Sequence, residues 1–437
     1  MQTATTTASR TEAGGAVAQG AHSTNAVETK QATSRQLISI VFILALATKM
    51  FLLPISLIQS IGRDAYIALA IGGGIDLITL GLLIATIKLS PDVDFFELLK
   101  RAFGKVGAKI FVAFVALFLF FKLNISTTES LTFYSDNVFA DFDTSLMIIV
   151  LLIFLTAAAC HTLRALSRLN ELLTPIIILC LALLAAIVVM TGFDLANILP
   201  AMRAPKSFAA DAARHAAWLG DFTPLLLFIG RTRTKKHTAA FTAASGVIGT
   251  ATAVFFSIVM CAAFGNVSVL ADTSTNLSSI LQYSIGNVYG RIDLFSSVLW
   301  SISAFIETAL FFYATCRCVA FVIGKNSHMP IAVGVCVALY FTQVYAMTDP
   351  TVFSLIVTSY AASAITLAFA VGIPTVALVC AVIAHKKDGN GKPASETADT
   401  ADTAADASGS ENAGDNENAD GAPQRGGELT ATTDAEG

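Results

Sequence analysis

The chain has 437 residues, of which 55% are hydrophobic and only 13% are charged, and its mean hydropathy is strongly positive. These values exclude an ordinary soluble enzyme and indicate a polytopic membrane protein. The formal net charge of −4 says little about partners, because the charges are concentrated in the tails and loops.

The two ends of the chain differ in composition from its middle. Residues 1–34 are rich in Ala, Thr and Ser and lack the apolar core of a cleavable signal peptide. Residues 388–437 are acidic and almost free of large apolar groups. Neither segment can bury enough surface to offset the entropy lost on ordering. We therefore expect disordered tails at 1–34 and 388–437 on either side of a membrane domain at 35–387.

Apolar runs that are long enough to cross a bilayer follow one another through the middle of the chain. A spanning helix needs about 20 apolar residues. By that measure the sequence predicts ten transmembrane helices, near residues 37–60, 65–89, 107–133, 144–160, 171–191, 217–230, 239–265, 291–323, 329–346 and 352–384. The first is interrupted at Lys49 and Pro54, and the sixth at Gly220, Asp221 and Pro224.

Basic residues mark alternate loops. They collect before the first predicted span and after spans 2, 4, 6, 8 and 10, whereas the other loops are leaner or acidic. The loop at 192–216 is the exception, with Arg203, Lys206 and Arg214. Cytoplasmic loops are enriched in Lys and Arg. We therefore expect a multi-pass protein of the cell membrane, in contact with the lipid bilayer and with both termini in the cytoplasm.

The two interrupted spans occupy equivalent positions. Dividing ten spans into two sets of five makes spans 1 and 6 the first helix of each half, and an odd number of spans requires the halves to have opposite topology. Interrupted helices at corresponding positions point to a transporter-type binding site at the membrane midplane. The sequence therefore predicts an all-α, inverted five-plus-five, leucine-transporter-like fold with broken helices 1 and 6. A proline kink alone would be weak support, because such kinks are common in membrane proteins.

Motifs for enzymatic chemistry are not found in a supporting context. The sequence has no HExxH, GxSxG or P-loop pattern that fits its surroundings, and Gly72–Gly74 lie within a predicted span, where glycines more often permit close helix approach. The spacing of the seven cysteines matches neither a disulfide framework nor a zinc site. We expect no enzymatic activity, no cofactor, no metal and no nucleic-acid partner.

A lysine within a spanning helix needs an explanation. At the centre of such a helix a lysine costs about 2.5–3.5 kcal/mol on insertion scales, so Lys49 is expected to face the protein interior and to have an acidic partner. Glu307 is the first candidate partner, followed by Glu129 or Asp221, and Asp76 in the second predicted span is another candidate. The pair either locks helices together or belongs to the functional site; the position of Lys49 at the interruption favours the second interpretation.

A ligand cavity is expected among spans 1, 3, 6 and 8. The ends of broken helices carry partial charges that suit a zwitterion or a small ion. Asp221 could there receive an ammonium group or, equally, cap a half-helix. The residues predicted to line the cavity are Thr48, Lys49, Phe51, Glu129, Asp221, Phe222, Thr223 and Ser303.

Six short segments follow one another along the membrane part of the chain, and their order and spacing are informative. These are LLP at 52–54, FFELLKRAFGKVGAKI at 95–110, STTES around Glu129, ALSRLNELLTP at 165–175, LGDFTPLLLFIG before a basic cluster, and GRIDLFSSVLW at 290–300. Together they resemble the spore germination permease family, the B-type subunit of bacterial germinant receptors, within the amino acid–polyamine–organocation superfamily. The resemblance covers about residues 35–386, and it depends on order and spacing rather than on one specific motif.

The resemblance implies a membrane subunit that senses a small nutrient, commonly an amino acid, and triggers spore germination. Such a subunit acts with a larger A-type membrane subunit and a C-type lipoprotein in the inner membrane of the spore. A secondary amino acid or amine permease is the alternative, and a purely structural membrane subunit is a third interpretation. Glu129 matches a glutamate of the family.

The chain also departs from the family at two places. Thr48-Lys49-Met50 stands where small, often glycine-rich residues are usual, and Glu307 stands where an uncharged residue is usual. Two opposite departures suggest mutual compensation. We hypothesise that the Lys49 ammonium occupies the place where related transporters hold a sodium ion.

Overall fold

The computed structural model describes residues 32–50, 52–137, 143–192, 195–199, 205–232, 235–264, 292–325 and 328–389. Within these residues the regular elements are helices, and an isolated β-bridge joins Ala32 to Thr232. The chain divides into two compact units, Met1–Lys387 and Asp388–Gly437, and the helical bundle forms the first. The predicted tails fall almost wholly outside the described residues, so their disorder stays a prediction.

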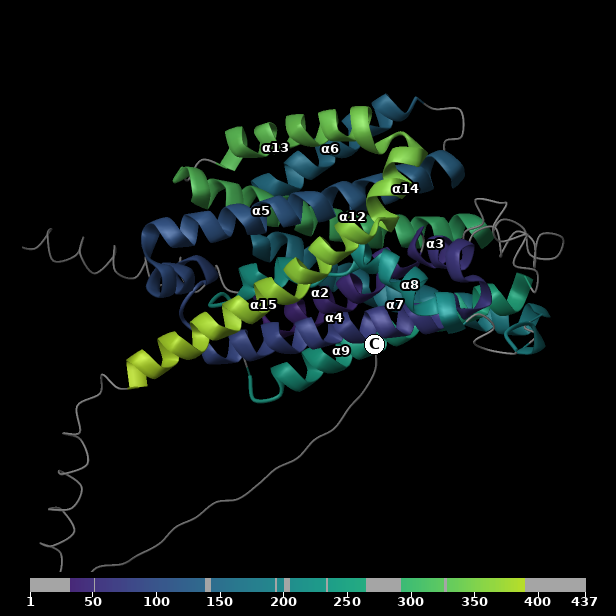
Figure 1. The fold of residues 1–437 in the computed structure, drawn as a ribbon, viewed down its shortest axis with the longest axis horizontal. Helices are drawn as coiled ribbons and strands as arrows, with labels where there is room; N and C mark the ends of the chain where they lie inside the picture. The colour runs from purple at the N-terminus through teal and green to yellow at the C-terminus, as the bar shows by residue number, and fades with distance from the viewer. Residues whose placement is uncertain are drawn as a thin grey trace, which may run out of the picture. The chain divides into compact units, whose positions relative to one another are not determined.

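The bundle is built from long α-helices separated by short 3₁₀ and π segments (Figure 1). In chain order they are α2 (Ser34–Leu46), η1 (Thr48–Met50), α3 (Leu52–Ile61), η2 (Gly62–Asp64), α4 (Ala65–Leu89), α5 (Phe95–Asn137), α6 (Thr144–Cys160), α7 (Leu163–Gly192), η3 (Leu195–Asn197), α8 (Pro205–Arg214), η4 (His215–Trp218), η5 (Thr223–Phe228), α9 (Thr238–Phe264), α12 (Ile292–Ile323), α13 (His328–Thr342), η6 (Gln343–Met347), α14 (Pro350–Thr358) and α15 (Tyr360–Gly389).

Seven helical runs among the described residues are long and apolar enough to cross a membrane, and α6 is a shorter apolar helix. The first of the seven joins α3 to α4, although the 3₁₀ turn η2 separates them. The difference from ten predicted spans lies in three segments. The segment 37–60 is divided between α2 and α3, α6 has 17 residues, and 217–230 contains 3₁₀ turns instead of an α-helix.

The helices pack in two connected groups. α2 packs against both α9 and α7, and α4 packs on α9, while α5 packs along α12 and α6 pairs with α13 beside α12. Figure 1 shows α2, α4 and α9 lying together, α6 and α13 at the opposite side of the bundle, and α15 crossing obliquely. η5 connects the two groups, because it contacts α4 as well as α5 and α12, and α12 also packs on α7 and α2.

Glycines allow the closest helix contacts. A Cβ atom on Gly249 of α9 would lie 2.7 Å from the Cβ of Ala45 and 2.9 Å from the carbonyl oxygen of Phe42, both in α2. A Cβ on Gly73 of α4 would overlap the side chain of Thr250 of α9. Larger residues would push these backbones apart, so the structure confirms for Gly73 the predicted role in close helix approach.

The outer surface of the bundle is apolar along the helices. Large hydrophobic side chains such as Ile78, Val106 and Leu172 are 64%, 73% and 70% exposed. Contiguous apolar surface of this kind is suited to lipid rather than to water. The described part of the chain is therefore an all-helical, multi-pass membrane protein.

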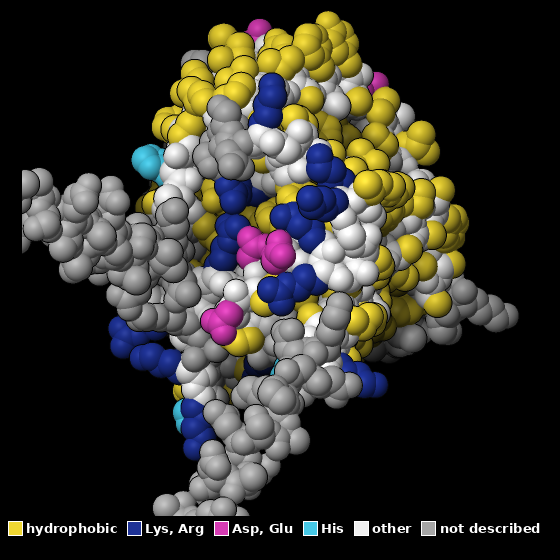
Figure 2. Space-filling view, turned by 90° about the vertical axis from the view of Figure 1, so that its left-hand side faces the viewer, with side chains coloured by type: hydrophobic (Ala, Val, Ile, Leu, Met, Phe, Trp, Pro, Cys, Tyr) yellow, Lys and Arg dark blue, Asp and Glu magenta, His cyan; other side chains and the backbone are white. Residues whose placement is uncertain are grey.

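Polar loops meet at one end of the bundle. Ala32, before α2, bridges to Thr232 after η5, and Arg231 forms a 2.9 Å ion pair with Asp94, before α5. The ammonium of Lys100 lies 5.5 Å from the centre of the Phe321 ring, near the end of α12. Three loops that were predicted to be cytoplasmic thus lie together with the start of α2. Figure 2 shows Lys and Arg side chains gathered around a few acids on the left-hand side of the view in Figure 1.

Candidate functional site

The first candidate span is broken where the sequence places Lys49. α2 ends at Leu46, one 3₁₀ turn covers Thr48–Met50, and α3 begins at Leu52. Pro54 lies in the first turn of α3, where a missing N–H costs no helical hydrogen bond, and it cannot donate to the carbonyl of Met50. The break therefore falls just before the proline.

The second break separates η4 from η5. Leu219 is extended after Trp218, and Gly220 has a φ of +94°, before η5 starts at Thr223. A Cβ atom on Gly220 would also lie 2.8 Å from the ring of Phe118. Both the positive φ and the close approach require glycine here. The non-helical residues leave backbone groups available for bonds to other helices.

Four buried charged side chains connect the two breaks. The ammonium of Lys49 lies 3.0 Å from Oδ2 of Asp76 and donates a hydrogen bond to Oδ2 of Asp221. Oδ1 of Asp221 lies 2.8 Å from the ammonium of Lys122. The order Lys122–Asp221–Lys49–Asp76, which we call the charge chain, contains two positive and two negative groups. Burial of these charges is tolerable because each has an opposite partner.

The charge chain also holds the backbone at the second break. Lys122 donates to the carbonyl of Trp218 over 2.9 Å, and the N–H of Gly220 donates to Oδ1 of Asp76 over 2.9 Å. Asp76 belongs to α4 and Lys122 to α5. α4 and α5 thus hold the broken segment from opposite ends of the charge chain.

Two further acids lie beside the first break with neutral donors only. The hydroxyl of Thr48 donates to Oε1 of Glu307, and the N–H of Leu52 donates to Oε1 of Glu129 over 3.1 Å. Glu129 is 2% and Glu307 1% exposed, and their carboxylates are close enough to repel each other. Neither forms a salt bridge with a described residue, so we call them the glutamate pair.

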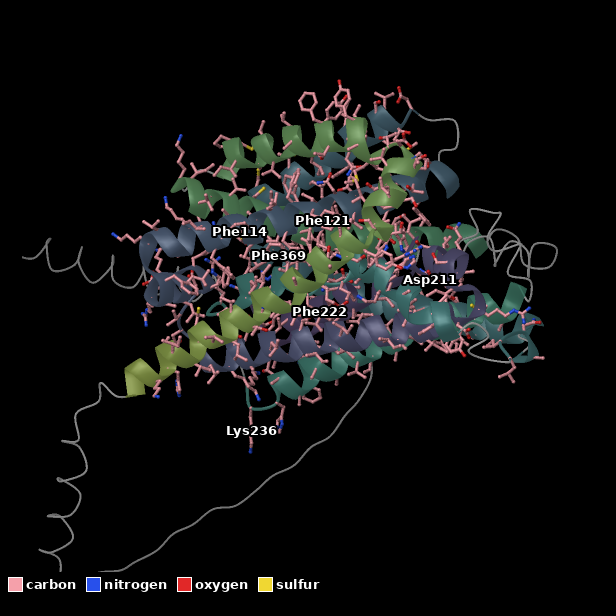
Figure 3. All side chains as sticks on the ribbon, in the orientation of Figure 1. Phe114, Phe121, Asp211, Phe222, Lys236 and Phe369 are labelled. Carbon is pink, nitrogen blue, oxygen red and sulfur yellow. The ribbon has the colours of Figure 1, made fainter. Side chains whose placement is uncertain are left out.

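The residues predicted to line a ligand cavity come together in the middle of the bundle. The described ones are at most 3% exposed, so the centre is closed in this structure. They are Thr48, Lys49, Glu129, Asp221, Phe222, Thr223 and Ser303; Phe51 lies outside the described residues. Figure 3 shows Phe222 within the bundle, away from Asp211 and Lys236. Their contact with a ligand stays a prediction.

The structure corrects the predicted partner of Lys49. Glu307 was the first choice, but among the described residues Lys49 forms salt bridges with Asp221, a named fallback, and with Asp76. Glu307 projects from the intact α12 and binds Thr48 instead, one residue before the lysine. Asp221 stands in the non-helical gap and reaches the facing break of span 1. Its carboxylate binds two lysines, and no cap to η5 is formed by a side chain.

Sequence reasoning left Lys122 out of the candidate site. Lys122 is 1% exposed and pairs with Asp221. A usable signal was present, since Lys122 interrupts the apolar run FLFFKLN in the same way that Lys49 interrupts its own. Applying the cost of a buried lysine to both positions would have identified it.

Two solved transporters are similar to this chain in structure. One is Mhp1, a nucleobase-cation-symport-1 family transporter in a closed conformation with bromovinylhydantoin bound. The two sequences are 12% identical, the match covers 80% of this chain and 78% of that chain, and the TM-score is 0.58. The other is the manganese transporter of Eremococcus coleocola in complex with an aromatic bis-isothiourea substituted compound, with 10% identity, coverage of 79% and 78%, and a TM-score of 0.51. These likenesses show a transporter fold.

Comparison with curated proteins finds no match. Comparison with protein families does find one, and it spans most of the membrane part: residues 31–351 match the family described as "Spore germination protein". The match includes both helix breaks and every member of the charge chain and of the glutamate pair. The chain therefore belongs to the spore germination protein family.

Proposed function

We propose that the chain is the membrane subunit of a nutrient germinant receptor, which binds a small, amino-acid-like nutrient in a transporter-fold pocket and triggers spore germination. Membership of the spore germination protein family and the transporter fold support this role. The observation that carries it is the meeting of two helix breaks in the bundle, joined through Lys49 and Asp221. Breaks of this kind form the binding sites of transporters.

The proposed architecture is ten spans in two inverted halves of five, with both termini in the cytoplasm. In this arrangement α2 with α3, and the segment 217–230 with its break at Gly220 and Asp221, are the broken first helices of the halves. The basic loops that lie together at one end of the bundle support the orientation, since cytoplasmic loops are rich in Lys and Arg. In a host that forms spores, the membrane is the spore inner membrane.

The proposed nutrient site is the centre that the two breaks share, with the eight predicted residues as its lining. It is closed in this structure, so nutrient binding requires the broken segments to move apart. The charge chain couples that movement to α4 and α5, because Asp76 and Lys122 hold the second break. The Lys49 ammonium, fixed between two carboxylates, acts as the built-in cation that makes binding independent of sodium.

The proposed partners are an A-type membrane subunit and a C-type lipoprotein. Spores that lack this chain are expected to lose the response to one nutrient, and the wild-type gene is expected to restore it. The tagged chain is expected to co-purify with both partners from spore membranes. An unchanged nutrient response in the deletion strain, for every nutrient that germinates the parent, would refute the receptor role. Genes for both partners beside this gene would support it.

A secondary amino acid or amine permease is the alternative function, favoured by the likeness to two transporters. Radiolabelled uptake into proteoliposomes that contain only this chain separates the two. The receptor role predicts binding without concentrative uptake. Saturable uptake that survives removal of all partner subunits would favour the permease.

A further inference from the structure

A cavity outside the closed centre is lined in part by Lys49 of the charge chain. This cavity of about 560 Å³ opens between α3, α4, α8, η4 and α15. Its volume falls within the range of small-molecule sites. Its walls are apolar, formed by side chains such as Leu57 and Leu69, and its rim includes Ile71 and Tyr360, which are 52% and 51% exposed. We call it the outer cavity, because it reaches the surface of the bundle between α4 and α15.

The lining of the outer cavity includes two buried hydrogen-bond donors with unused capacity. Lys49 has three N–H donors, and its partners among the described residues are the carboxylates of Asp76 and Asp221. The indole N–H of Trp218 has no hydrogen-bond partner in the described part of the chain, and Trp218 is 1% exposed. A buried donor without an acceptor is unfavourable, so an acceptor supplied by a ligand would be stabilising.

Two side chains in the lining of the outer cavity that can accept hydrogen bonds, His215 and Ser363, are already engaged. The ring of His215 bonds to the hydroxyl of Ser56 over 3.0 Å and to the carbonyl of Asp211 over 2.9 Å. The Ser363 hydroxyl accepts from the N–H of Ala217 and donates to the carbonyl of Arg214. No aspartate or glutamate is among the described residues that line the cavity. An ammonium group would find no counter-charge there.

We propose that the outer cavity binds a small molecule with a compact apolar body and one hydrogen-bond-accepting group, a carboxylate or a carbonyl, and that it discriminates against amines. The apolar body fills the space between α3, α4 and α15, and the accepting group takes the free N–H groups of Lys49 and Trp218. The occupant then touches the first helix break from outside. Binding at this site does not depend on the receptor role.

The chain contains two tryptophans, which provides a direct test. In a Trp300→Phe variant, Trp218 is the single indole and reports on its own hydrogen bond. The protein is placed in lipid nanodiscs and titrated with 3-phenylpropionate and, separately, with 3-phenylpropylamine, which share an apolar body. We expect a saturable shift of the Trp218 emission with the carboxylate, and at least tenfold weaker binding of the amine. Equal binding of the two probes, or no saturable shift, would overturn the proposal.

A matched pair of variants on α15 locates the site. Ala364 and Ala361 are both exposed, but only Ala364 lines the outer cavity. In the Trp300→Phe background, Ala364→Phe is expected to weaken 3-phenylpropionate binding at least tenfold, whereas Ala361→Phe leaves it within twofold. Melting temperatures without ligand establish that both variants fold. If the two variants bind the probe alike, the shift arises outside this cavity and the proposal is wrong.

Discussion

Two groups of buried acids lie beside the helix breaks, and their charges are balanced differently. In the charge chain, Asp76 and Asp221 alternate with Lys49 and Lys122, so that each carboxylate touches an ammonium. In the glutamate pair, Glu129 and Glu307 receive only a backbone N–H and a hydroxyl.

This difference in charge balance suggests a structural role for the charge chain and a ligand-responsive role for the glutamate pair. Removing one member of a balanced chain leaves its partner buried and unpaired, so the cost of desolvating that charge is no longer offset. Removing one member of an unbalanced pair relieves repulsion instead. The charge chain is therefore expected to hold the two breaks together, and the glutamate pair to be the part that a cationic group can neutralise.

The largest effect is expected for Lys49→Ala. This change leaves Asp76 without a cation, whereas Asp221 keeps Lys122, and it should lower the free energy of unfolding by about 3–5 kcal/mol. Thermal unfolding in detergent can be followed with a thiol-reactive dye, because the described cysteines other than Cys160 are buried. A loss below about 1 kcal/mol would show that Lys49 reaches water.

Double variants identify which acid is paired with Lys49. Lys49→Ala combined with Asp76→Asn restores equal numbers of opposite charges and should recover a large part of the loss, because Lys122 and Asp221 remain paired. Lys49→Ala combined with Glu307→Gln should be the sum of the two single changes. Recovery with Glu307→Gln instead would return Glu307 to the role predicted from sequence.

A smaller effect, of opposite sign, is expected for Glu307→Gln. The amide oxygen still accepts from Thr48, and the loss of one negative charge relieves repulsion with Glu129. We expect stability to be unchanged or to rise by up to about 2 kcal/mol. The same unfolding assay measures it, and Glu129→Gln is the matched control. Destabilisation as large as that of Lys49→Ala would mean that Glu307 has a cationic partner after all.

His215 provides a pH test at the opposite end of η4 from the second break. Burial lowers the pKa of His215 below its ordinary value of 6.5, and Arg214 also lowers it, against hydrogen bonds to Asp211 and Ser56. The unfolded chain therefore binds a proton that the folded chain does not, and stability should fall as the pH drops below 6.5, by about 1.4 kcal/mol per unit by which the pKa is lowered.

The control for that test is His237, which lies just before α9. His215→Gln should flatten the dependence of melting temperature on pH between 8 and 5, while His237→Gln, at an exposed site before α9, should keep it. Identical pH profiles for His215→Gln and the wild type would show that another group causes the acid sensitivity.

The smallest effect is expected at the basic end of the bundle. Arg231 and Asp94 form a 2.9 Å ion pair, but their side chains are 26% and 33% exposed. Solvent screens such a pair, so Arg231→Ala should change the free energy of unfolding by at most about 1 kcal/mol, and the change should shrink in high salt. A loss comparable to that of Lys49→Ala would erase the distinction between buried and exposed charges in this protein.

Particular residues show how far sequence reasoning reached. Gly220, Asp221 and Pro224 signalled the second break, and Lys49 signalled the first, because each is costly or restricted in a continuous apolar helix. The length of the 217–230 segment did not reveal that its turns are 3₁₀, since 3₁₀ and α-helical turns accept the same apolar residues. The count of spans was least secure where helices are short or broken.

The partner of Lys49 could not be read from the sequence. Asp76, Glu129, Asp221 and Glu307 are all acids in apolar runs, and hydropathy ranks them alike. The sequence by itself determined that a buried lysine must meet a buried acid, because an unpaired charge is too costly in an apolar interior. Only the tertiary structure decided which acid it meets, because that depends on how two non-helical backbones face each other across the bundle, and local composition does not specify the distance between them.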